Sequence, residues 1–476
     1  MGRIVVIGAG LGAMAAAARL AVAGHAVTVY ERSATYGGAV GRFERDGFAF
    51  DTGPGLLHLP AVYRDLFVKT GKKPLEECVG LRQVDPAARH VFADGTRVDL
   101  PNASRAGTVA ALDAALGAGA GARWGDFLTR AREAWDRTRR PLLEEPQPAD
   151  PRALAGEPYP APRAGLLRRP TRTLAQVGAR ELGDDRLVAL LGSYAEAYGF
   201  PAASAPASAA VLPYMEQTFG SWYVAGGMRA LADAVYERCR ERRVEFVFGE
   251  AVDEVLTGAG RAVGVRLASG ATVEADHVVA GAPVPALLRE QVVPWERSDE
   301  WPRFPAHGTG RLTVLLALRG AREEGAAHRT VVHGGDHAPV TVLRPDDPAL
   351  RPDAEHESVV LSAGVRTLPG QDWPGLADAM VEAAGRALPG LAGRLLWREV
   401  RTPEDVREAT GAAEVPGPAL ADARGEWLPA ANRSPVPGLY FAGGWSHPGG
   451  GLAHAGMSGA LVAGLIVEGA EFRGSR

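Results

Sequence analysis

The sequence predicts an α/β fold that begins with a β-α-β unit, and three features of its first residues support this prediction. An apolar, β-branched run over Arg3–Ile7 is typical of a buried parallel strand, and glycines follow it directly. An alanine-rich helix then continues to Gly24, a residue type that often ends helices. A second strand over residues 26–31 finishes on Glu31. This order of elements predicts a Rossmann-type unit.

The glycine turn between the first strand and the helix has the spacing of a dinucleotide-binding site. Gly8 permits the tight turn, Gly10 lets the backbone approach a pyrophosphate, and Ala13 takes the sixth position, which the fingerprint allows. The helix N-terminus supplies free N–H groups and a favourable dipole. Glu31 is placed to accept hydrogen bonds from a ribose. A secretory signal, the alternative for such a start, needs neither these glycines nor the terminal acid.

Length and composition exclude several classes of protein. A chain of 476 residues can bury a large core, and we expect two interleaved domains. The net charge of −4 gives no electrostatic basis for binding nucleic acid. Cys78 and Cys239 lack metal-ligand spacing and cannot form a disulfide framework, so we expect a cytoplasmic location and no metal. No apolar run is long enough to span a bilayer, although peripheral contact with the inner face of the membrane stays open.

The later elements are predicted in chain order from local patterns. Residues 60–71 favour a helix, and Asp94-Gly95 marks a hairpin turn. The proline-rich stretch 141–170 is expected to be irregular. The remaining predictions are two helices over 104–139, helices over 171–200 and 204–217, an amphipathic helix over 228–243, strands within 244–281 and within 309–363, a helix over 374–388, a strand over 438–444 and a small-residue helix ending near 468.

Segments of the nucleotide-binding type are scattered along the chain. We expect them to form one discontinuous domain from residues 1–103, 226–300 and 430–476. Residues 104–225 are expected to form a helical insertion that faces substrate or membrane, and residues 301–429 a sheet with helices. A second G-x-G-x-x-A match, at residues 117–122, follows a helix and not a strand, so we reject it. The presence of a single dinucleotide-binding fold argues against disulfide reductases and against flavin monooxygenases that have two such folds.

Four motifs occur in a fixed order along the chain. They are Gly8-Ala-Gly10-Leu-Gly12 with Glu31-Arg32, Gly37-Gly38, Asp51-Thr52-Gly53-Pro54, and Gly438-Leu-Tyr-Phe-Ala-Gly443 followed by His447-Pro448-Gly449-Gly450-Gly451. This set resembles the bacterial phytoene (carotenoid) desaturases, which belong to the FAD-dependent amine-oxidase superfamily. The segment 207–228 looks like the end of that family's substrate domain, so the resemblance runs essentially end to end.

The resemblance implies a GR2-like, Rossmann-type FAD-binding domain with an interleaved substrate domain of mixed sheet plus helices. It implies non-covalent FAD, and NADPH stays open as a transient reductant. Two departures, Ala39 where the family often has Arg and Gly444 where many amine oxidases have Asp, suggest altered ribityl contacts. By similarity the cofactor-binding residues are Gly8, Gly10, Leu11, Gly12, Ala13, Glu31, Arg32, Gly38, Arg42, Gly53, Pro54, Val252, Gly443, Gly444, Gly451 and Leu452.

Candidate catalytic residues are few, because a tunnel for a hydrocarbon must be apolar. They are His447, His58 and Glu216. The alternative for His447 is a loop histidine whose hydrogen bonds go to the backbone, and the alternative for His58 is a role at the surface or at the start of a helix. The alternative for Glu216 is a solvated carboxylate on a helix. His454 is undecided. Tyr214, Trp222 and Tyr223 are expected to wall a substrate cavity, although an aromatic cluster is more often core, and Tyr194 and Tyr198 share that alternative.

The function that the resemblance implies is an FAD-dependent oxidoreductase that desaturates a lipophilic isoprenoid or polyene by hydride transfer to flavin. One alternative is an NADPH-dependent reductase or reductive cyclase of a polyene natural product. Another, of a different class, is a non-catalytic prenyl-binding carrier of the GDP-dissociation-inhibitor type. For the arginine-rich segment 162–172 the resemblance implies a membrane-surface patch, with an ordinary exposed loop as the alternative. The sequence leaves the oligomeric state open.

Overall fold

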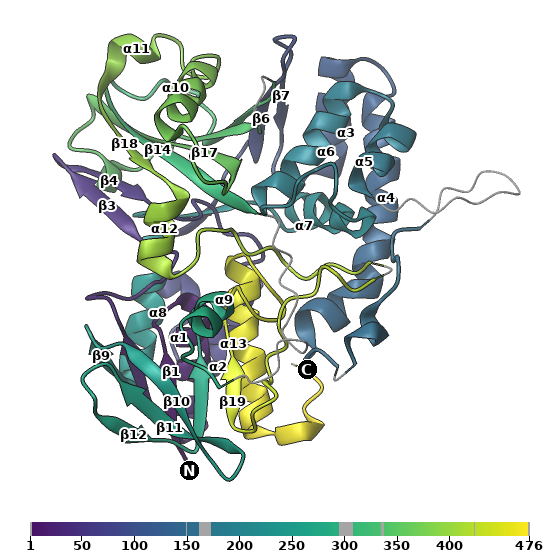
Figure 1. Cartoon of the computed structure of the whole chain (residues 1–476). Helices are drawn as coiled ribbons and strands as arrows, with labels where there is room; N and C mark the ends of the chain where they lie inside the picture. The colour runs from purple at the N-terminus through teal and green to yellow at the C-terminus, as the bar shows by residue number, and fades with distance from the viewer. Residues whose placement is uncertain are drawn as a thin grey trace, which may run out of the picture.

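The computed structural model describes residues 2–148, 150–160, 173–294, 308–334, 338–422 and 424–474. Two large sheets and a group of helices make up the molecule, and the chain passes between these parts several times (Figure 1). The α/β class that the sequence predicts is confirmed. The arginine-rich segment 162–172 lies outside the described residues. None of the described helices is long and apolar enough to cross a membrane.

A five-stranded parallel sheet holds the predicted β-α-β unit. Its strand order is β19-β13-β1-β2-β9, so strands from the beginning, middle and end of the chain lie side by side. Alternate residues of β1 point to opposite faces: Val6 packs under α1 and α8, whereas Val5 packs against the side that carries β10 and β11. The bounds are β1 Arg3–Ile7, β2 Ala26–Glu31, β9 Glu245–Phe248, β13 His277–Ala280 and β19 Leu439–Phe441.

Helices and a small sheet cover the two faces of this parallel sheet. The three-stranded sheet β10-β11-β12 lies on one face, and α1 and α8 lie on the other (Figure 1). The bounds of these elements and of their neighbours α2, α9 and α13 are α1 Leu11–Val22, α2 Ala61–Thr70, α8 Arg229–Glu241, β10 Val252–Gly258, β11 Arg261–Leu267, β12 Thr272–Glu274, α9 Val284–Arg289 and α13 Leu452–Val467.

A seven-stranded mixed sheet has the order β18-β14-β17-β16-β15-β6-β7, and α10 packs on it. Strands β6 and β7 come from the segment 1–103, which the sequence assigns to the nucleotide-binding domain, yet β6 pairs with β15 of the segment 301–429 and β7 pairs with β6. Strand patterns show which residues are buried, not which sheet buries them. The bounds are β6 Ala88–Val91, β7 Arg97–Leu100, β14 Thr309–Arg319, β15 Arg329–Val332, β16 Val340–Leu343, β17 His356–Arg366, α10 Trp373–Ala384, α11 Leu391–Arg394, β18 Leu395–Arg401 and α12 Pro403–Thr410.

Helices dominate the described part of the segment between residues 104 and 225 (Figure 1). They pack around the buried Trp124. The expected helix over 171–200 is interrupted because Gly183 adopts a left-handed conformation and Asp184 then caps α6. The helical path of α4 continues through Pro141 as a π-helical turn, where we expected irregular structure. The bounds are α3 Arg105–Leu116, α4 Ala120–Arg139, η2 Arg140–Glu144, η3 Pro151–Leu154, α5 Leu174–Val177, η4 Gly178–Leu182, α6 Asp185–Ala197, η5 Ala207–Ala210 and α7 Val211–Phe219.

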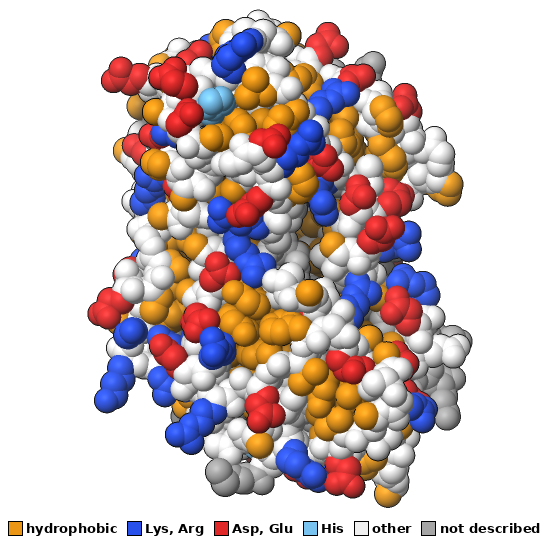
Figure 2. All heavy atoms as spheres, turned by 90° about the vertical axis from the view of Figure 1, so that its left-hand side faces the viewer, with side chains coloured by type: hydrophobic (Ala, Val, Ile, Leu, Met, Phe, Trp, Pro, Cys, Tyr) orange, Lys and Arg blue, Asp and Glu red, His pale blue; other side chains and the backbone are white. Residues whose placement is uncertain are grey.

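The surface of the molecule mixes charges of both signs. Figure 2 shows one face, on which groups of hydrophobic side chains are separated by Lys, Arg, Asp and Glu, so no large field of one sign covers it.

Short elements connect these parts of the fold. They are β3 Arg42–Arg45, β4 Phe48–Asp51, η1 Leu75–Glu77, β5 Leu81–Gln83, β8 Trp222–Val224, η7 Pro348–Leu350 and η8 Gly469–Glu471.

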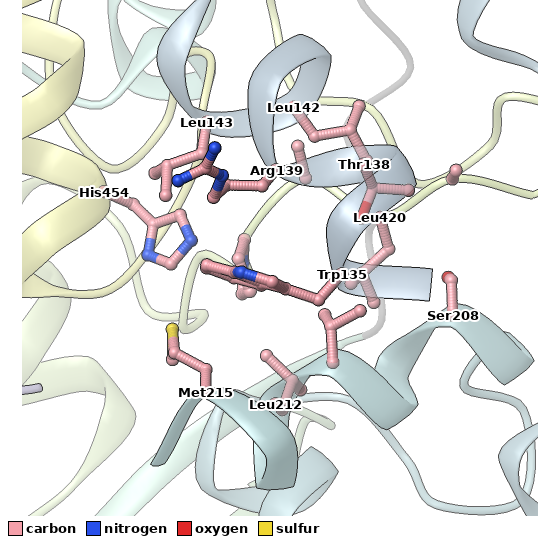
Figure 3. A pocket seen from close by; sticks show the side chains of 14 residues that line it. Trp135, Thr138, Arg139, Leu142, Leu143, Ser208, Leu212, Met215, Leu420 and His454 are labelled. Carbon is pink, nitrogen blue, oxygen red and sulfur yellow. The ribbon is translucent and has the colours of Figure 1, made fainter. Parts of the chain in front are cut away.

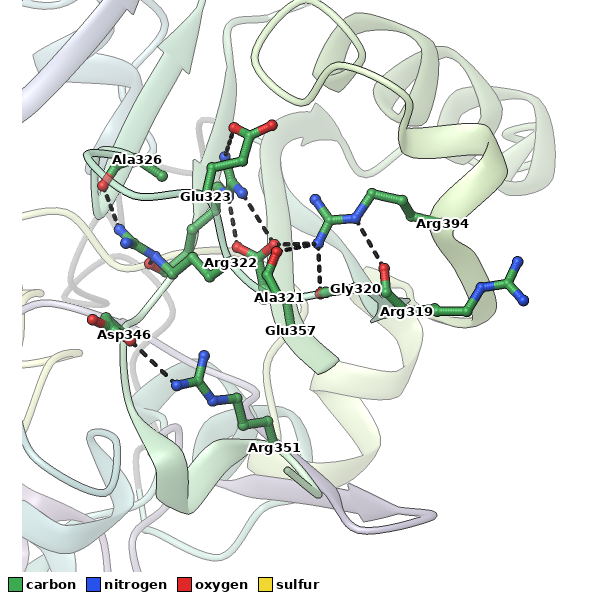
Figure 4. Close-up of polar contacts among 11 residues, drawn as sticks. Arg319, Gly320, Ala321, Arg322, Glu323, Ala326, Asp346, Arg351, Glu357 and Arg394 are labelled. Carbon is green, nitrogen blue, oxygen red and sulfur yellow. Dashed lines mark hydrogen bonds and ion pairs between the residues drawn. The ribbon is translucent and has the colours of Figure 1, made fainter. Parts of the chain in front are cut away.

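A buried ion-pair network ties the strands of the mixed sheet together at one end. Glu357, at the start of β17, accepts hydrogen bonds from Arg344 at 2.7 and 3.0 Å and from Arg394 at 2.9 Å (Figure 4). Arg394 also donates to the carbonyl oxygens of Arg319 and Gly320, which follow one another at the end of β14. The network therefore joins β14, β17, the end of β16 and α11.

Two buried imidazoles meet where β6 pairs with β15. His90 Nδ1 lies 2.8 Å from His333 Nε2, and the His333 ring stacks on Phe92. Burial lowers the pKa of His333 to about 4, helped by the charge of Arg386. Burial also lowers the pKa of His90 well below its usual value, helped by His333 and Arg329. Both rings are therefore neutral in the folded protein near neutral pH.

We expect the free energy of unfolding to fall as the pH drops from about 6.5 to about 4. In the unfolded chain these histidines bind protons below about 6.5, whereas the folded protein excludes them until the pH is much lower, so acid favours unfolding. Urea unfolding at several pH values measures this slope. The double variant H90Q/H333Q is expected to show a shallower slope than the variant H25Q, and equal slopes would contradict this account.

Candidate active site

The turn between β1 and α1 leaves open space beside Gly10. Gly8 has φ +87° and donates its N–H to the Tyr30 carbonyl oxygen at 2.8 Å, which fixes the turn against β2. Gly10 is the N-cap residue of α1, and a Cβ built on it meets no atom within 4 Å. No side chain caps this twelve-residue helix, so its first N–H groups are available to an anion.

Gly12 brings α1 against the C-terminal part of the chain. A Cβ built on Gly12 lies 2.6 Å from Gly443 Cα and 2.7 Å from the Ala455 carbonyl oxygen, so a larger residue does not fit. Leu11 and Ala13, on either side of it, are buried in the core. The start of α1 is therefore in direct contact with the loop after β19 and with α13.

Glu31 ends β2 with its carboxylate held in a fixed orientation. One oxygen accepts a hydrogen bond from the Ala9 N–H at 2.7 Å, and the other accepts one from the Ser33 N–H at 2.9 Å. Each oxygen keeps a second lone pair for a ligand hydroxyl. The neighbouring Arg32 is exposed, and it donates to the carbonyl oxygen of Glu408 at 3.0 Å. Arg32 thus contacts α12, whereas Glu31 contacts the glycine turn.

A second loop lies over the first. The Gly37 N–H donates to the Ala9 carbonyl oxygen at 2.8 Å. Gly38 has φ +60°, and a Cβ built on it lies 3.1 Å from Gly10 Cα, so both glycines allow the two backbones to approach. Arg42, at the start of β3, donates to the Gly226 carbonyl oxygen at 3.3 Å and pairs with Glu44. Its guanidinium is therefore engaged by the protein.

The segment after β4 packs under this second loop. A Cβ on Gly53 would overlap the Ala39 carbonyl oxygen, and Pro54 next to it is exposed. Asp51 ends β4, and it accepts hydrogen bonds from the N–H groups of Met228 at 2.7 Å and Arg229 at 3.2 Å. Burial raises the pKa of Asp51 to about 6, although these hydrogen bonds oppose the shift. The acid of the Asp-Thr-Gly-Pro motif therefore caps α8, a role that the motif alone does not reveal.

Val252 begins β10 near the end of β2. Glu250, two residues before Val252, donates its N–H to the Glu31 carbonyl oxygen at 3.1 Å. This hydrogen bond brings the segment beside Glu31, the acid that we expect to bind a ribose. The Val252 side chain is buried against β1 and β11. Its backbone is therefore close to Glu31, although the two residues are far apart in sequence.

The loop after β19 brings a second helix N-terminus to the site. Gly443 has φ +108°, and Gly444 lies between Pro416 and Gly450. Gly451 is the N-cap residue of α13, and no side chain caps this sixteen-residue helix. The Leu452 carbonyl oxygen accepts a hydrogen bond from the Tyr63 hydroxyl at 2.8 Å, which anchors the helix start to α2.

A buried polar network that sequence patterns did not reveal holds this loop in place. Asn432 Nδ2 donates to the carbonyl oxygens of Phe441 and His447 and to Ser458 Oγ, at 3.1, 2.6 and 3.1 Å. Ser458 Oγ in turn accepts the Gly443 N–H at 3.0 Å. Asn432 Oδ1 is buried without a hydrogen-bond partner among the described residues. No local signal marks Asn432, because its partners lie up to 26 residues away in sequence.

His447 has its ring buried against the helical segment. Its Nε2 donates to the Glu145 carbonyl oxygen at 2.9 Å, and its Nδ1 is buried without a partner among the described residues. Burial lowers the pKa of His447 to about 4, so the ring is neutral at neutral pH. This contact ties the C-terminal loop to the end of η2.

Glu216 and His58 meet in a buried cluster. Glu216 is 4% exposed, forms an ion pair with Arg329 and lies 3.7 Å from His58 Nε2. The expectation of a solvated carboxylate is therefore wrong, because the side chain points inward from α7. Burial alone would raise the pKa of Glu216. The charges of Arg329 and His58 outweigh this effect, so the pKa of Glu216 is lowered and the carboxylate stays ionised. Burial lowers the pKa of His58.

The three aromatic residues that we expected to wall one cavity point in different directions. Trp222 and Tyr223 are adjacent on β8, so their side chains lie on opposite faces. Trp222 lies beneath Arg64 of α2, whereas the Tyr223 hydroxyl donates to Asp347 at 2.7 Å. Tyr214 packs near Trp135. Adjacent strand positions cannot line one side of a cavity, which the sequence interpretation overlooked.

A pocket lies between the helical segment and the start of α13 (Figure 3). It is a small pocket that is partly open to solvent. Leu212 and Met215, on either side of Tyr214 in α7, line it together with Trp135 and Leu143. His454, in the first turn of α13, lines it as well, and burial lowers the pKa of His454 to about 4.

The geometry fits a dinucleotide that extends from Glu31 to α13. The space beside Gly10, the uncapped starts of α1 and α13 and the oriented carboxylate of Glu31 supply partners for a pyrophosphate and a ribose. Residues 14–467 match the family of flavin-containing amine oxidoreductases, and the chain belongs to that family. It is a flavin-containing oxidoreductase whose cofactor is FAD, as the resemblance implied. The carrier alternative is therefore set aside.

Three curated relatives match nearly the whole chain. Hydroxyneurosporene desaturase of Cereibacter sphaeroides is 30% identical over 98% of this chain and 97% of its own length. The zeta-carotene-forming phytoene desaturase of Myxococcus xanthus is 29% identical over 99% and 95%. The 4,4'-diapolycopene oxygenase of Methylomonas sp is 29% identical over 98% of both proteins. The predicted resemblance to carotenoid desaturases is confirmed.

Solved structures share the fold at low identity. Putrescine oxidase bound to putrescine aligns with a TM-score of 0.67 at 17% identity, over 98% of this chain and 99% of that chain. An oxidoreductase from Methanosarcina mazei aligns with a TM-score of 0.67 at 16% identity, over 97% and 99%. At such identities the likeness concerns the fold alone.

Proposed function

We propose that the protein is an FAD-dependent desaturase that acts on a lipophilic isoprenoid or polyene. The observation that carries this proposal is the apolar pocket at the start of α13. Most of its lining is apolar, as Trp135, Leu212 and Met215 illustrate, and its polar lining residues are Thr138, Arg139, Ser208 and His454. Gly451, a cofactor-site residue by resemblance, lies three positions before His454. An apolar pocket beside a flavin suits a substrate that is mostly hydrocarbon.

The names of the relatives support the same substrate class. Two of them are called desaturases of carotenoids and the third an oxygenase of one, and all three align with this chain over nearly its full length. Full-length similarity includes the helical segment that lines the pocket, and not only the nucleotide-binding part. The substrate class is therefore proposed for the whole chain.

The chain's own residues have three tasks in such a reaction. The start of α1 beside Gly10 and the carboxylate of Glu31 would hold FAD, which would supply the acceptor for a hydride from one carbon. The pocket holds the reacting carbons beside the start of α13. The neighbouring carbon loses a proton, which the neutral imidazole of His454 can accept on a ring nitrogen. Glu216 is less suited to this task, because Arg329 already binds its carboxylate.

We expect the purified protein to be yellow, and its visible flavin band to bleach when phytoene or neurosporene in detergent micelles is added without oxygen. Anaerobic absorbance spectra before and after addition, with NADPH alone as a parallel sample, measure this. If NADPH bleaches the flavin band and the polyenes do not, the proposed desaturase function is wrong and a reductive enzyme is indicated instead. Bleaching by neither reductant nor polyene would overturn the proposed substrate class.

A further inference from the structure

Ser208 is a buried hydroxyl in apolar surroundings. Its side chain is 1% exposed, and its Oγ has no hydrogen-bond partner among the described residues. The other residues of η5, at positions 207, 209 and 210, are all alanines, and all are buried. A buried hydroxyl without a partner destabilises the protein, and a fourth alanine would avoid that cost. The hydroxyl therefore calls for a partner that the protein itself does not supply.

Ser208 also lines the apolar pocket described above, and Figure 3 places it at the side away from His454. The side chains of Trp135 and Leu212 lie between these two polar residues (Figure 3). His454 marks the side at the start of α13, where FAD binds by resemblance. A molecule in this pocket would have one part near the cofactor site and another part near Ser208.

We propose that this pocket binds an end of the substrate that carries a hydroxyl or carbonyl oxygen, and that Ser208 Oγ forms a hydrogen bond with that oxygen. The inference rests on the proposed function and narrows its substrate class from hydrocarbon polyenes to oxygenated ones. The pocket is small and partly open to solvent, so it would admit only the tip of a long chain, and most of its lining side chains are apolar, as an isoprenoid requires. Ser208 then selects between two molecules that differ only in the terminal oxygen.

Binding of two matched probes to the yellow holoenzyme tests this proposal. The probes are geranylgeraniol and the C20 hydrocarbon that lacks its hydroxyl, and quenching of protein fluorescence gives their dissociation constants. We expect the wild type to bind the alcohol about three- to tenfold more tightly, which is the range of one neutral hydrogen bond. The variant Ser208→Ala is expected to lose this preference and to bind the hydrocarbon at least as well as the wild type does.

Two control variants assign the effect to Ser208. Ser204, on the neighbouring exposed turn, bonds the Pro201 carbonyl oxygen, and Ser204→Ala is expected to keep the preference. His454→Leu is expected to keep it as well, so loss of the preference in this variant alone would overturn the assignment to Ser208. Equal binding of both probes by the wild type would overturn this inference while leaving the proposed function standing. A yellow wild-type protein that binds neither probe would overturn both.

Discussion

The variant Gly10→Val is expected to fold like the wild type and to purify without flavin. Gly10 has φ −72° and ψ 162°, which any residue adopts, and a Cβ there meets no protein atom within 4 Å. The valine side chain therefore enters the space that the pyrophosphate needs without disturbing the apoprotein. We expect a loss of FAD affinity of at least about 100-fold, because the phosphate contacts with the start of α1 are blocked. Flavin absorbance per protein and a titration of the apoprotein with FAD measure it.

Two other glycines serve as controls for this variant. Gly156 is exposed and has equally open surroundings, so Gly156→Val is expected to keep both flavin and stability. Gly12→Val introduces a side chain against the backbone of Gly443 and Ala455, so it is expected to lower the melting temperature of the apoprotein too. Full FAD binding by Gly10→Val would show that the pyrophosphate lies elsewhere.

The variant Glu357→Ala is expected to lower the free energy of unfolding by about 3–5 kcal/mol. Glu357 is 1% exposed and Arg344 is 4% exposed, so removing the carboxylate leaves a buried guanidinium whose remaining carboxylate neighbour, Glu323, is exposed and lies 3.6 Å away. Arg394 loses a partner as well, although it keeps the carbonyl oxygens at the end of β14. Chemical denaturation of the apoprotein, followed by circular dichroism, measures the change.

An exposed acid close by provides the matched comparison. Glu355 precedes β17 on the surface, and Glu355→Ala is expected to change stability by less than about 0.5 kcal/mol. If Glu357→Ala cost no more than Glu355→Ala, the network would contribute nothing to stability. The exposed partner of the network, Glu323, lies 3.6 Å from Arg344, and we assign it a small share for the same reason.

The parts of the fold that the sequence predicts well are those with short-range causes. The β-α-β unit is set by neighbouring residues: apolar side chains make β1, Gly8 makes the turn, and Glu31 ends β2. The helix after Gly451 follows from the same kind of local pattern. In each case the residues that determine the structure lie within one strand-turn-helix segment, so a single window of sequence contains the signal.

The parts that escape prediction depend on distant segments. Nothing around Asn432 shows that it supports the loop of Gly443, and nothing around Glu216 shows that Arg329 will meet it. Tyr214, Trp222 and Tyr223 do not wall one common cavity for a different reason, because neighbouring positions of a strand face opposite sides. Tyr223 by itself lines a pocket beside Asp51 and Gly53. Polar partners brought together by tertiary packing carry no periodic pattern, and so they remain invisible until the chain is folded.

The order of strands in the parallel sheet has a consequence for synthesis. β1 and β2 leave the ribosome well before their partners, because β1 pairs with β13 and β13 pairs with β19 at residues 439–441. The start of α13 follows later still. The nascent chain therefore carries an unpaired, apolar edge of β1 until β13 emerges, a state that invites aggregation or chaperone binding. The dinucleotide site lacks one of its two helix starts until α13 has been synthesised as well, so we expect stable flavin binding to follow the synthesis of α13.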